Sequence, residues 1–248
     1  MADGTRAQAT TDRCGFGYAN DVLERFPTIR AGVVHVDGVH NGSSPPALRE
    51  RYRATQEDVG HRLATTPIAE HPSISAWRRV FSAFGAKPTQ YRNAAEALLR
   101  RLSKQGDIPS ISLLVDIGNL VSIRHAVPVA VLDVAAVDGE VTVRFATGSE
   151  RFADLRSDGE ERPEPGEVVF VDEAGVVSAR RWCWRQSAVT ATSPTTTGAL
   201  FVVEAHHDGA ADDVAAAADE IGQLLASLEP SAVTTTAQLS PAAPRWHC

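Results

Sequence analysis

The spacing of apolar residues changes along the chain. Between residues 47 and 126 apolar residues recur mostly at helical spacing, whereas from Val127 onward they alternate with polar ones. The first pattern predicts helices over 47–65, 73–84 and 91–104 and a central helix after Pro109, and the second predicts strands. Helices followed by antiparallel hairpins favour an α+β domain over a parallel doubly wound sheet.

Turn residues divide the second half of the chain into strands. Asp138-Gly139 predicts a hairpin between the apolar residues around Val131 and those at 141–145. Residues 173–175 separate 167–172 from 176–184 and predict a second hairpin. One strand is expected at 31–39 and another at 198–205, and an Ala-rich amphipathic helix is expected at 210–228.

The two ends of the chain are polar and rich in small residues. We therefore expect residues 1–12 and 229–248 to be disordered. The remaining residues, 13–228, are then expected to form a single α+β domain with N-terminal helices, antiparallel hairpins and a C-terminal helix.

The central segment, residues 108–133, carries two polar residues in an apolar stretch. Asp116 and Asn119 lie three apart, so on a helix they share one face. Burying a carboxylate and an amide costs several kcal/mol unless both are hydrogen-bonded. Two interpretations stay open: Asp116 braces a neighbouring loop, or the polar face lines a cleft.

Composition points to an ordinary soluble protein of one or two domains. The chain has 248 residues, of which 43% are hydrophobic and 22% charged. It contains no apolar run near the ~18 residues that a membrane span needs. The three cysteines, Cys14, Cys183 and Cys248, are odd in number and far apart, which fits neither a disulfide framework nor a zinc site. We therefore expect a cytoplasmic protein without a metal.

Charge is unevenly distributed, although the net charge is −7. Residues 78–104 hold seven basic residues against Glu96 alone, and residues 204–229 hold acidic residues without any Lys or Arg. The net charge argues against non-specific coating of nucleic acid, yet the basic run could bind phosphates locally. A solvated helix face is the alternative interpretation of such a run.

Several enzyme classes are excluded by missing motifs. The chain has no GxGxxG or GxxxxGK[ST] loop, no GxSxG elbow and no HExxH helix. A nucleotide cofactor is therefore not expected. His206 and His207 are adjacent on an expected strand, where successive side chains point to opposite faces, so one metal ion would rarely use both.

A set of motifs in a fixed order resembles a known family. The order is KPT (87–89), ALLRRL (97–102), IPSISLLVDIGNLVSI (108–123), PVAVLD (128–133), VRFATGSERF (143–152) and PGEVVFVDEAGVVSARRWCWRQS (165–187). It resembles the B3/B4 domain, the editing module of the beta subunit of bacterial phenylalanyl-tRNA synthetase. It is closer still to free-standing proteins that consist of this domain alone. The resemblance covers roughly residues 70–228.

The resemblance implies an activity on tRNA. It implies trans-acting editing, in which the ester bond of mischarged aminoacyl-tRNA is hydrolysed. No cofactor, no membrane and no obligate protein partner are expected. The alternative is a non-catalytic tRNA- or amino-acid-binding protein that kept the editing fold. A small-molecule pocket with unrelated chemistry is a third possibility.

Two departures from the family pattern remove its tyrosine specificity. The family's PxHAxD turn contributes a histidine to the editing pocket, whereas this chain has Ala130 at that place. The family's GGEHSG loop carries a glutamate that recognises the tyrosine hydroxyl, and Arg185 aligns with it. Arg185 beside Gln186 could instead bind a carboxylate, a phosphate or the terminal adenosine. The catalytic residue stays unknown.

The resemblance and the polar positions together suggest two groups of residues. The substrate pocket is expected to be formed by Asn119, Ser122, Arg144, Glu150, Arg185, Gln186, Thr195, Thr196 and Thr197. The tRNA-binding surface is expected to be formed by Lys87, Arg92, Arg100, Arg101 and Lys104.

The editing interpretation depends on one spatial expectation. The helix with Asp116 and Asn119 should form one wall of a cleft, and the hairpin with Trp182 and Trp184 should form the other. These tryptophans alternate on an expected strand, so they would share a face. They could stack on adenine or on a substrate ring, or pack in the core.

Overall fold

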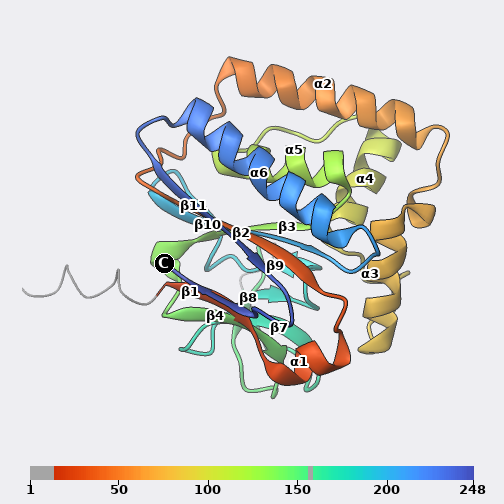
Figure 1. Ribbon diagram of the computed structural model, residues 1–248, viewed down its shortest axis with the longest axis vertical. Helices are drawn as coiled ribbons and strands as arrows, with labels where there is room; N and C mark the ends of the chain where they lie inside the picture. The colour runs from red at the N-terminus through yellow and green to blue at the C-terminus, as the bar shows by residue number, and fades with distance from the viewer. Residues whose placement is uncertain (1–13, 156–158) are drawn as a thin grey trace, which may run out of the picture.

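The computed structural model describes residues 14–155 and 159–248, and they form three layers. A layer of helices covers one face of a four-stranded sheet, and a six-stranded sheet covers the other face (Figure 1). Two hydrophobic cores fill the spaces between the layers. The expected α+β class is confirmed.

The four-stranded sheet is the middle layer. Its order is β11 (Val233–Leu239), β2 (Arg30–Asp37), β10 (Gly198–Ala205) and β3 (Val129–Asp133), and all neighbours are antiparallel. Alternate residues of β10 enter different cores: Phe201 and Val203 face the helices, whereas Leu200 and Val202 face the other sheet. Burial on both faces explains why β10 is almost continuously apolar.

The six-stranded sheet has the order β12-β1-β4-β7-β8-β9. Its strands are β12 (Arg245–His247), β1 (Gly15–Tyr18), β4 (Glu140–Phe145), β7 (Val168–Val171), β8 (Val177–Arg180) and β9 (Arg185–Gln186). β1 and β4 are parallel, and the other neighbours are antiparallel. A short ribbon, β5 (Phe152–Ala153) with β6 (Glu160–Glu161), is separate from both sheets.

One expected hairpin is confirmed and the other is wrong. β7 and β8 pair across residues 173–175 as expected. β3 and β4 do not pair, because β3 joins β10 whereas β4 joins β1 and β7. The 3-10 turn η3 (Val134–Ala136) and Gly139, whose φ is 73°, carry the chain from one sheet to the other. A turn signal fixes a change of direction but not the partner strand.

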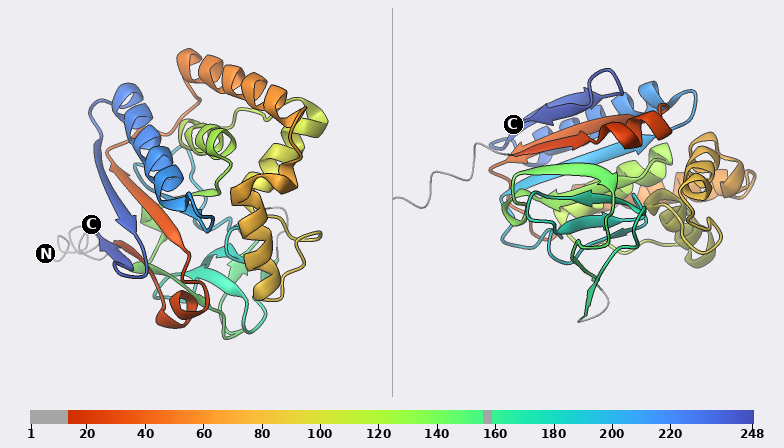
Figure 2. Two further views of the ribbon diagram at one scale, coloured as in Figure 1. Left: turned by 45° about the vertical axis from the view of Figure 1, so that its right-hand side comes forward. Right: turned by 90° about the horizontal axis from the view of Figure 1, so that it is seen from below.

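The helices are α1 (Asn20–Arg25), α2 (Pro46–Leu63), α3 (Pro72–Ala83), α4 (Ala94–Gln105), α5 (Leu113–His125) and α6 (Ala210–Leu228), with a 3-10 helix η2 (Ile68–Glu70) before α3. The expected helices at 47–65, 73–84 and 210–228 are confirmed with small shifts at their ends. α5 and α6 lie against the four-stranded sheet, with α2 outside them (Figures 1 and 2). No helix among the described residues is both long and apolar enough for a membrane span.

The expectation of a disordered C-terminal segment is wrong. Residues 233–239 form β11 and pair along β2, and residues 245–247 form β12 beside β1. Cys248 forms a disulfide with Cys14, with 5.5 Å between the two Cα atoms. The expectation that the cysteines form no disulfide is therefore wrong. The expectation for residues 1–12 lies outside the described residues.

Candidate functional site

A small cavity lies where the edges of the two sheets meet. Its walls come from the start of β3, the turn between β8 and β9, and the end of β10. The cavity measures about 50 Å³. Two hydrogen bonds hold its walls together: Gln186 Nε2 donates to the Val131 carbonyl at 2.6 Å, and the Ala94 amide donates to the Cys183 carbonyl at 2.8 Å.

The turn after β8 has an unusual backbone. Arg181 and Trp182 have φ values of 44° and 63°, in the left-handed region that costs a non-glycine residue about 1–3 kcal/mol. Glu167 compensates for this cost, because its carboxylate accepts from the Arg181 amide at 2.9 Å and from two nitrogens of Arg180 at 3.0 Å each. The turn directs the Trp182 indole inward, where it is fully buried. The expected strand through residues 181–184 is therefore wrong, and Trp182 is a core residue.

Glu204 is a buried acid beside the cavity. On β10 its side chain points in the same direction as that of Val202, toward the six-stranded sheet, and both residues line the cavity. Its Oε1 accepts from the Tyr18 hydroxyl at 2.5 Å and from the Trp182 indole nitrogen at 2.8 Å. Burial outweighs these hydrogen bonds and raises the pKa of Glu204 to about 7. The carboxyl group can therefore exchange a proton near neutral pH.

Cys183 and Tyr18, the ionisable groups closest to Glu204, stay protonated at neutral pH. Burial raises the pKa of the Cys183 thiol well above its usual value, and the nearby Glu204 raises it further. Burial and Glu204 also raise the pKa of Tyr18. A protonated thiol is a weak nucleophile, so Cys183 is not suited to covalent catalysis. The cavity is suited instead to proton transfer by Glu204.

Two arginines and two aromatic rings form a patch at the outer side of the same turn. We call Tyr91, Arg181, Trp184 and Arg185 the arginine–aromatic patch. The Arg181 guanidinium lies 4.0 Å from the Tyr91 ring centre, and that of Arg185 lies 4.2 Å from the Trp184 ring centre. Tyr91 and Trp184 meet edge to face at 4.9 Å. Arg185 also pairs with Asp154. Such a surface can stack a base or bind a phosphate.

A groove of about 430 Å³ adjoins the arginine–aromatic patch. Arg181 and Tyr91 line it together with Arg25, Phe84 and the loop at 164–167. It is therefore much larger than the cavity beside Glu204, and it shares two residues with the patch.

The comparison with protein families identifies the chain. Residues 76–222, more than half of the chain, match the family model of the B3/4 domain. This chain belongs to the B3/4 domain family. The β3 segment, the turn after β8 and Glu204 all lie within the matched region.

A solved structure also matches this B3/4 protein. It is an N-terminal fragment of the phenylalanyl-tRNA synthetase beta-subunit from Pyrococcus horikoshii, with 10% sequence identity and a TM-score of 0.47. The match covers 94% of this chain and 56% of that fragment, so this chain spans just over half of the fragment's length. None of the curated proteins matches this chain significantly.

Of the nine residues expected in the substrate pocket, two line the cavity of this B3/4 domain. Arg185 and Gln186 lie in its wall, next to Ala130. The structure brings β3 and the segment with Arg185 together around this cavity. The remaining seven expected residues are placed elsewhere.

Helix α5 does not form a wall of the cavity, so the expected cleft between this helix and the tryptophan hairpin is wrong. The four-stranded sheet separates α5 from the turn after β8: Val131 packs in the core beneath the helices, whereas Trp182 packs in the other core. Asn119 lies beside Tyr52 of α2, and the Ser122 hydroxyl donates to the Val127 carbonyl at the end of its own helix. Both residues therefore lie on the helical side of the four-stranded sheet.

Asp116 braces a loop, as one of the two interpretations predicted. Its fully buried carboxylate accepts from the Ser44 hydroxyl at 2.6 Å, the Ile111 amide at 2.8 Å and the Ser110 hydroxyl. These bonds fix the segment that leads into α5. The Asp116 carboxylate is thus satisfied within the fold.

The other expected pocket residues form two separate local networks. Arg144 Nη1 donates to Glu150 at 2.5 Å, and Glu150 also accepts from the Thr147 and Gly148 amides. Thr196 donates to Asp133 at 2.5 Å, while Thr195 and Thr197 are exposed beside it. Hydrogen bonds with Thr147 and Arg144 lower the pKa of Glu150 to about 2 despite its burial.

The expected tRNA-binding residues lie on α4 and the loop before it. Arg92 and Arg100 share the buried carboxylate of Glu96 with Arg78, and Arg101 donates to the Asp107 carbonyl. Lys87 and Lys104 are exposed, and neither forms an ion pair within the described residues. The buried Glu96 carboxylate thus neutralises part of the positive charge of the basic residues at 78–104.

Glu204, Tyr18 and Trp182 form the network that the sequence interpretation missed. In the sequence Glu204 reads as one of the acidic residues at 204–229, although it is the sole charged residue of an apolar strand. That isolation was the available signal, because a carboxylate at such a position is buried and needs partners. Tyr18 comes from the first strand, 186 residues away, and no local pattern connects the two.

Proposed function

We propose that this B3/4 protein hydrolyses the ester bond of mischarged aminoacyl-tRNA in trans. The observation that carries the proposal is the Glu204 carboxyl group, whose pKa of about 7 suits a general base at neutral pH. Support also comes from membership of the family and from the position of Glu204 beside the two segments that resemble the editing pocket.

In the proposed reaction Glu204 activates a water molecule in the cavity. The carboxylate takes a proton from water as the water oxygen attacks the ester carbonyl carbon. The ester C–O bond then breaks, and the proton passes to the ribose oxygen of the terminal adenosine. The products are a free amino acid and an uncharged tRNA. No covalent enzyme intermediate is needed, which agrees with the protonated state of Cys183.

The arginine–aromatic patch provides a place for the end of the tRNA. Trp184 and Tyr91 offer ring faces and edges for a base, and Arg181 and Arg185 offer charge for a phosphate. The adjoining groove of about 430 Å³ has room for further nucleotide atoms. The exposed Lys87 and Lys104 would contact the phosphate backbone beyond it.

The size of the cavity restricts the aminoacyl group. A volume of about 50 Å³ corresponds to roughly three to five water molecules at about 10–15 Å³ each. An aromatic side chain does not fit beside a catalytic water in this space. We therefore propose that the substrate carries a small aminoacyl group.

A deacylation assay tests the proposal directly. The purified chain should hydrolyse tRNA charged with a small amino acid faster than buffer does, and faster than tRNA charged with tyrosine. Glu204→Gln should lower this rate at least about 100-fold, the usual contribution of general base catalysis. Glu220→Gln is the matched control, because Glu220 is also a buried glutamate but lies on α6 among Arg51, Arg124 and His125.

Each part of the proposal has an outcome that contradicts it. If a full panel of aminoacyl-tRNAs survives incubation, the hydrolase proposal fails. If Glu204→Gln and Glu220→Gln are equally active, Glu204 is not the base. If tyrosine is released faster than a small amino acid, the size argument fails.

A non-catalytic tRNA-binding role is the second candidate, and the arginine–aromatic patch favours it independently of Glu204. It expects tRNA binding that weakens steeply with salt and that is lost in Arg181→Ala, without any deacylation. A gel-shift titration at two salt concentrations, with the deacylation assay run in parallel, distinguishes the two functions.

A further inference from the structure

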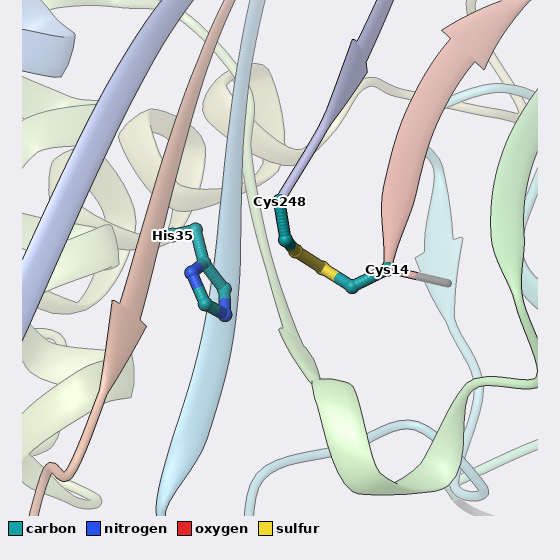
Figure 3. A group of neighbouring side chains, drawn as sticks. All are labelled: Cys14, His35 and Cys248. Carbon is teal, nitrogen blue, oxygen red and sulfur yellow. A yellow bond between two sulfur atoms is a disulfide. The ribbon is translucent and has the colours of Figure 1, made fainter. Parts of the chain in front are cut away.

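Two cysteines and a histidine meet at the edge of the six-stranded sheet that is opposite the cavity. Cys14 precedes β1, Cys248 follows β12, and His35 lies on β2 of the middle sheet (Figure 3). One ligand atom from each residue lies within 4.8 Å of the other two. Within the described part of the chain, no other group of three or more potential metal ligands comes this close together.

His35 is positioned by ring packing and not by hydrogen bonds to its ring nitrogens. Its ring lies 5.8 Å from the Trp246 ring of β12, and it forms no hydrogen bond with any described residue. Either ring nitrogen is therefore available as a ligand to a metal.

We propose that, when the disulfide is reduced, Cys14, Cys248 and His35 bind a thiophilic divalent cation such as Zn²⁺. Two thiolates and one imidazole are a common zinc ligand set, and a water molecule would complete the tetrahedron. Zinc–sulfur bonds of about 2.3 Å place two sulfur atoms roughly 3.8 Å apart. Cα atoms 5.5 Å apart allow this separation through side-chain rotation alone.

The metal-bound and disulfide forms would interconvert through two-electron chemistry. A phosphine and one water molecule convert the disulfide into two thiols: the S–S bond breaks, phosphorus takes the oxygen, and each sulfur takes a proton. Metal binding then releases both protons to solvent. In reverse, the two thiolates reduce a small-molecule disulfide to two thiols, which take two protons from solvent, while the Cys14–Cys248 bond forms and the cation leaves.

Either form would fasten β12 to β1. β12 has three residues paired to β1, and the Cys248 amide adds one hydrogen bond to the Cys14 carbonyl. A pairing this short frays easily without a covalent or metal link. The site would therefore keep the two ends of the domain together under reducing and oxidising conditions alike.

Cobalt spectroscopy on the full chain tests the site. Cys183→Ala is the background, because it removes the remaining thiol. After phosphine reduction, one equivalent of Co²⁺ should produce the visible bands of tetrahedral cobalt and thiolate-to-metal charge transfer, and Zn²⁺ should displace it. The oxidised chain should give neither signal. His35→Ala should weaken Zn²⁺ binding at least about tenfold, since even outer-shell losses cost 10–100-fold.

His247→Ala is the matched control. His247 neighbours Cys248 but is exposed and lies on the side of β12 that faces Gly15, so its loss should leave the cobalt spectrum unchanged. If the reduced chain gives no tetrahedral thiolate spectrum, or if His247→Ala weakens binding as much as His35→Ala, the proposal is overturned.

A folding measurement covers the case in which reduction unfolds the chain. Circular dichroism would be followed during reduction with and without Zn²⁺. If the folded spectrum is retained or recovered only when Zn²⁺ is present, the result supports the site. A chain that stays folded without binding metal, or unfolded in its presence, overturns it.

Discussion

At the scale of single residues, Glu204 shows how burial and hydrogen bonding compete. Two donors, the Tyr18 hydroxyl and the Trp182 indole, stabilise the ionised carboxylate, yet desolvation is larger and raises its pKa to about 7. Glu150 shows the opposite balance, because hydrogen bonds from the Thr147 amide and from Arg144 outweigh desolvation and lower its pKa to about 2. The same residue type thus acquires different chemistry from its surroundings.

The raised pKa of Glu204 makes stability depend on pH. Between pH 4.5 and 7 the folded chain keeps a proton that the unfolded chain has released, so the free energy of unfolding falls as pH rises. A difference between about 4.5 and about 7 corresponds to about 3 kcal/mol at 1.36 kcal/mol per pKa unit. Urea unfolding at pH 5 and pH 7.5 should show this fall, and Glu204→Gln should remove most of it. If the free energy of unfolding of Glu204→Gln falls with pH as much as that of the wild type, the assignment of the raised pKa to Glu204 is contradicted.

At the scale of elements, close packing of α5 on β3 depends on one glycine. A Cβ atom at Gly118 would lie 2.8 Å from the Cγ2 of Val131, so a side chain there forces the helix and sheet apart. Gly222 on α6 has no atom within 4 Å of the same position. Both glycines lie in the interior of a helix, but Gly118 packs closely against another element and Gly222 does not. They are therefore a matched pair for comparison.

The two alanine variants should change stability in opposite directions. Gly118→Ala should lower the free energy of unfolding by about 1–3 kcal/mol through overpacking. Gly222→Ala should raise it by up to about 1 kcal/mol, because alanine favours the helix and meets no neighbour. Urea unfolding monitored by circular dichroism measures both. A stabilising Gly118→Ala would show that α5 can move away from β3 without cost.

At the scale of the whole molecule, the strands at both ends of the described chain belong to one sheet. β1 and β12 are neighbours, and the Cys14–Cys248 disulfide joins residues 234 positions apart. β1 also supplies Tyr18 to the Glu204 network. A link at the sheet edge therefore stabilises the strand that supports the candidate site at a distance.

Loss of the disulfide should lower stability in the absence of metal. A crosslink of this length restricts the unfolded chain, and its removal from a native protein costs about 2–5 kcal/mol. Cys14→Ser should therefore lower the midpoint of urea unfolding in the presence of a chelator. Cys183→Ala is the control, since Cys183 is not in the disulfide. Equal midpoints for wild type and Cys14→Ser would mean that the link adds no stability.

The sequence by itself determined the elements whose patterns are local. Helical spacing identified α2, α3 and α6, the turn at 173–175 identified the β7–β8 hairpin, and an apolar run identified β10. The ordered motifs also indicated the B3/4 family, which the family model confirmed. These features depend on neighbours a few residues apart, so periodicity and turn residues are enough to find them.

Only the tertiary structure decided what depends on distant partners. It placed β3 and β4 in different sheets, ordered the Thr-rich β11 against β2, and put the middle sheet between α5 and the turn with Trp182. It also brought Tyr18 to Glu204 and Cys14 to Cys248. The physical reason is that strand partners, ion environments and crosslinks are set by contacts between residues far apart in the chain. No local pattern encodes which of those residues will meet.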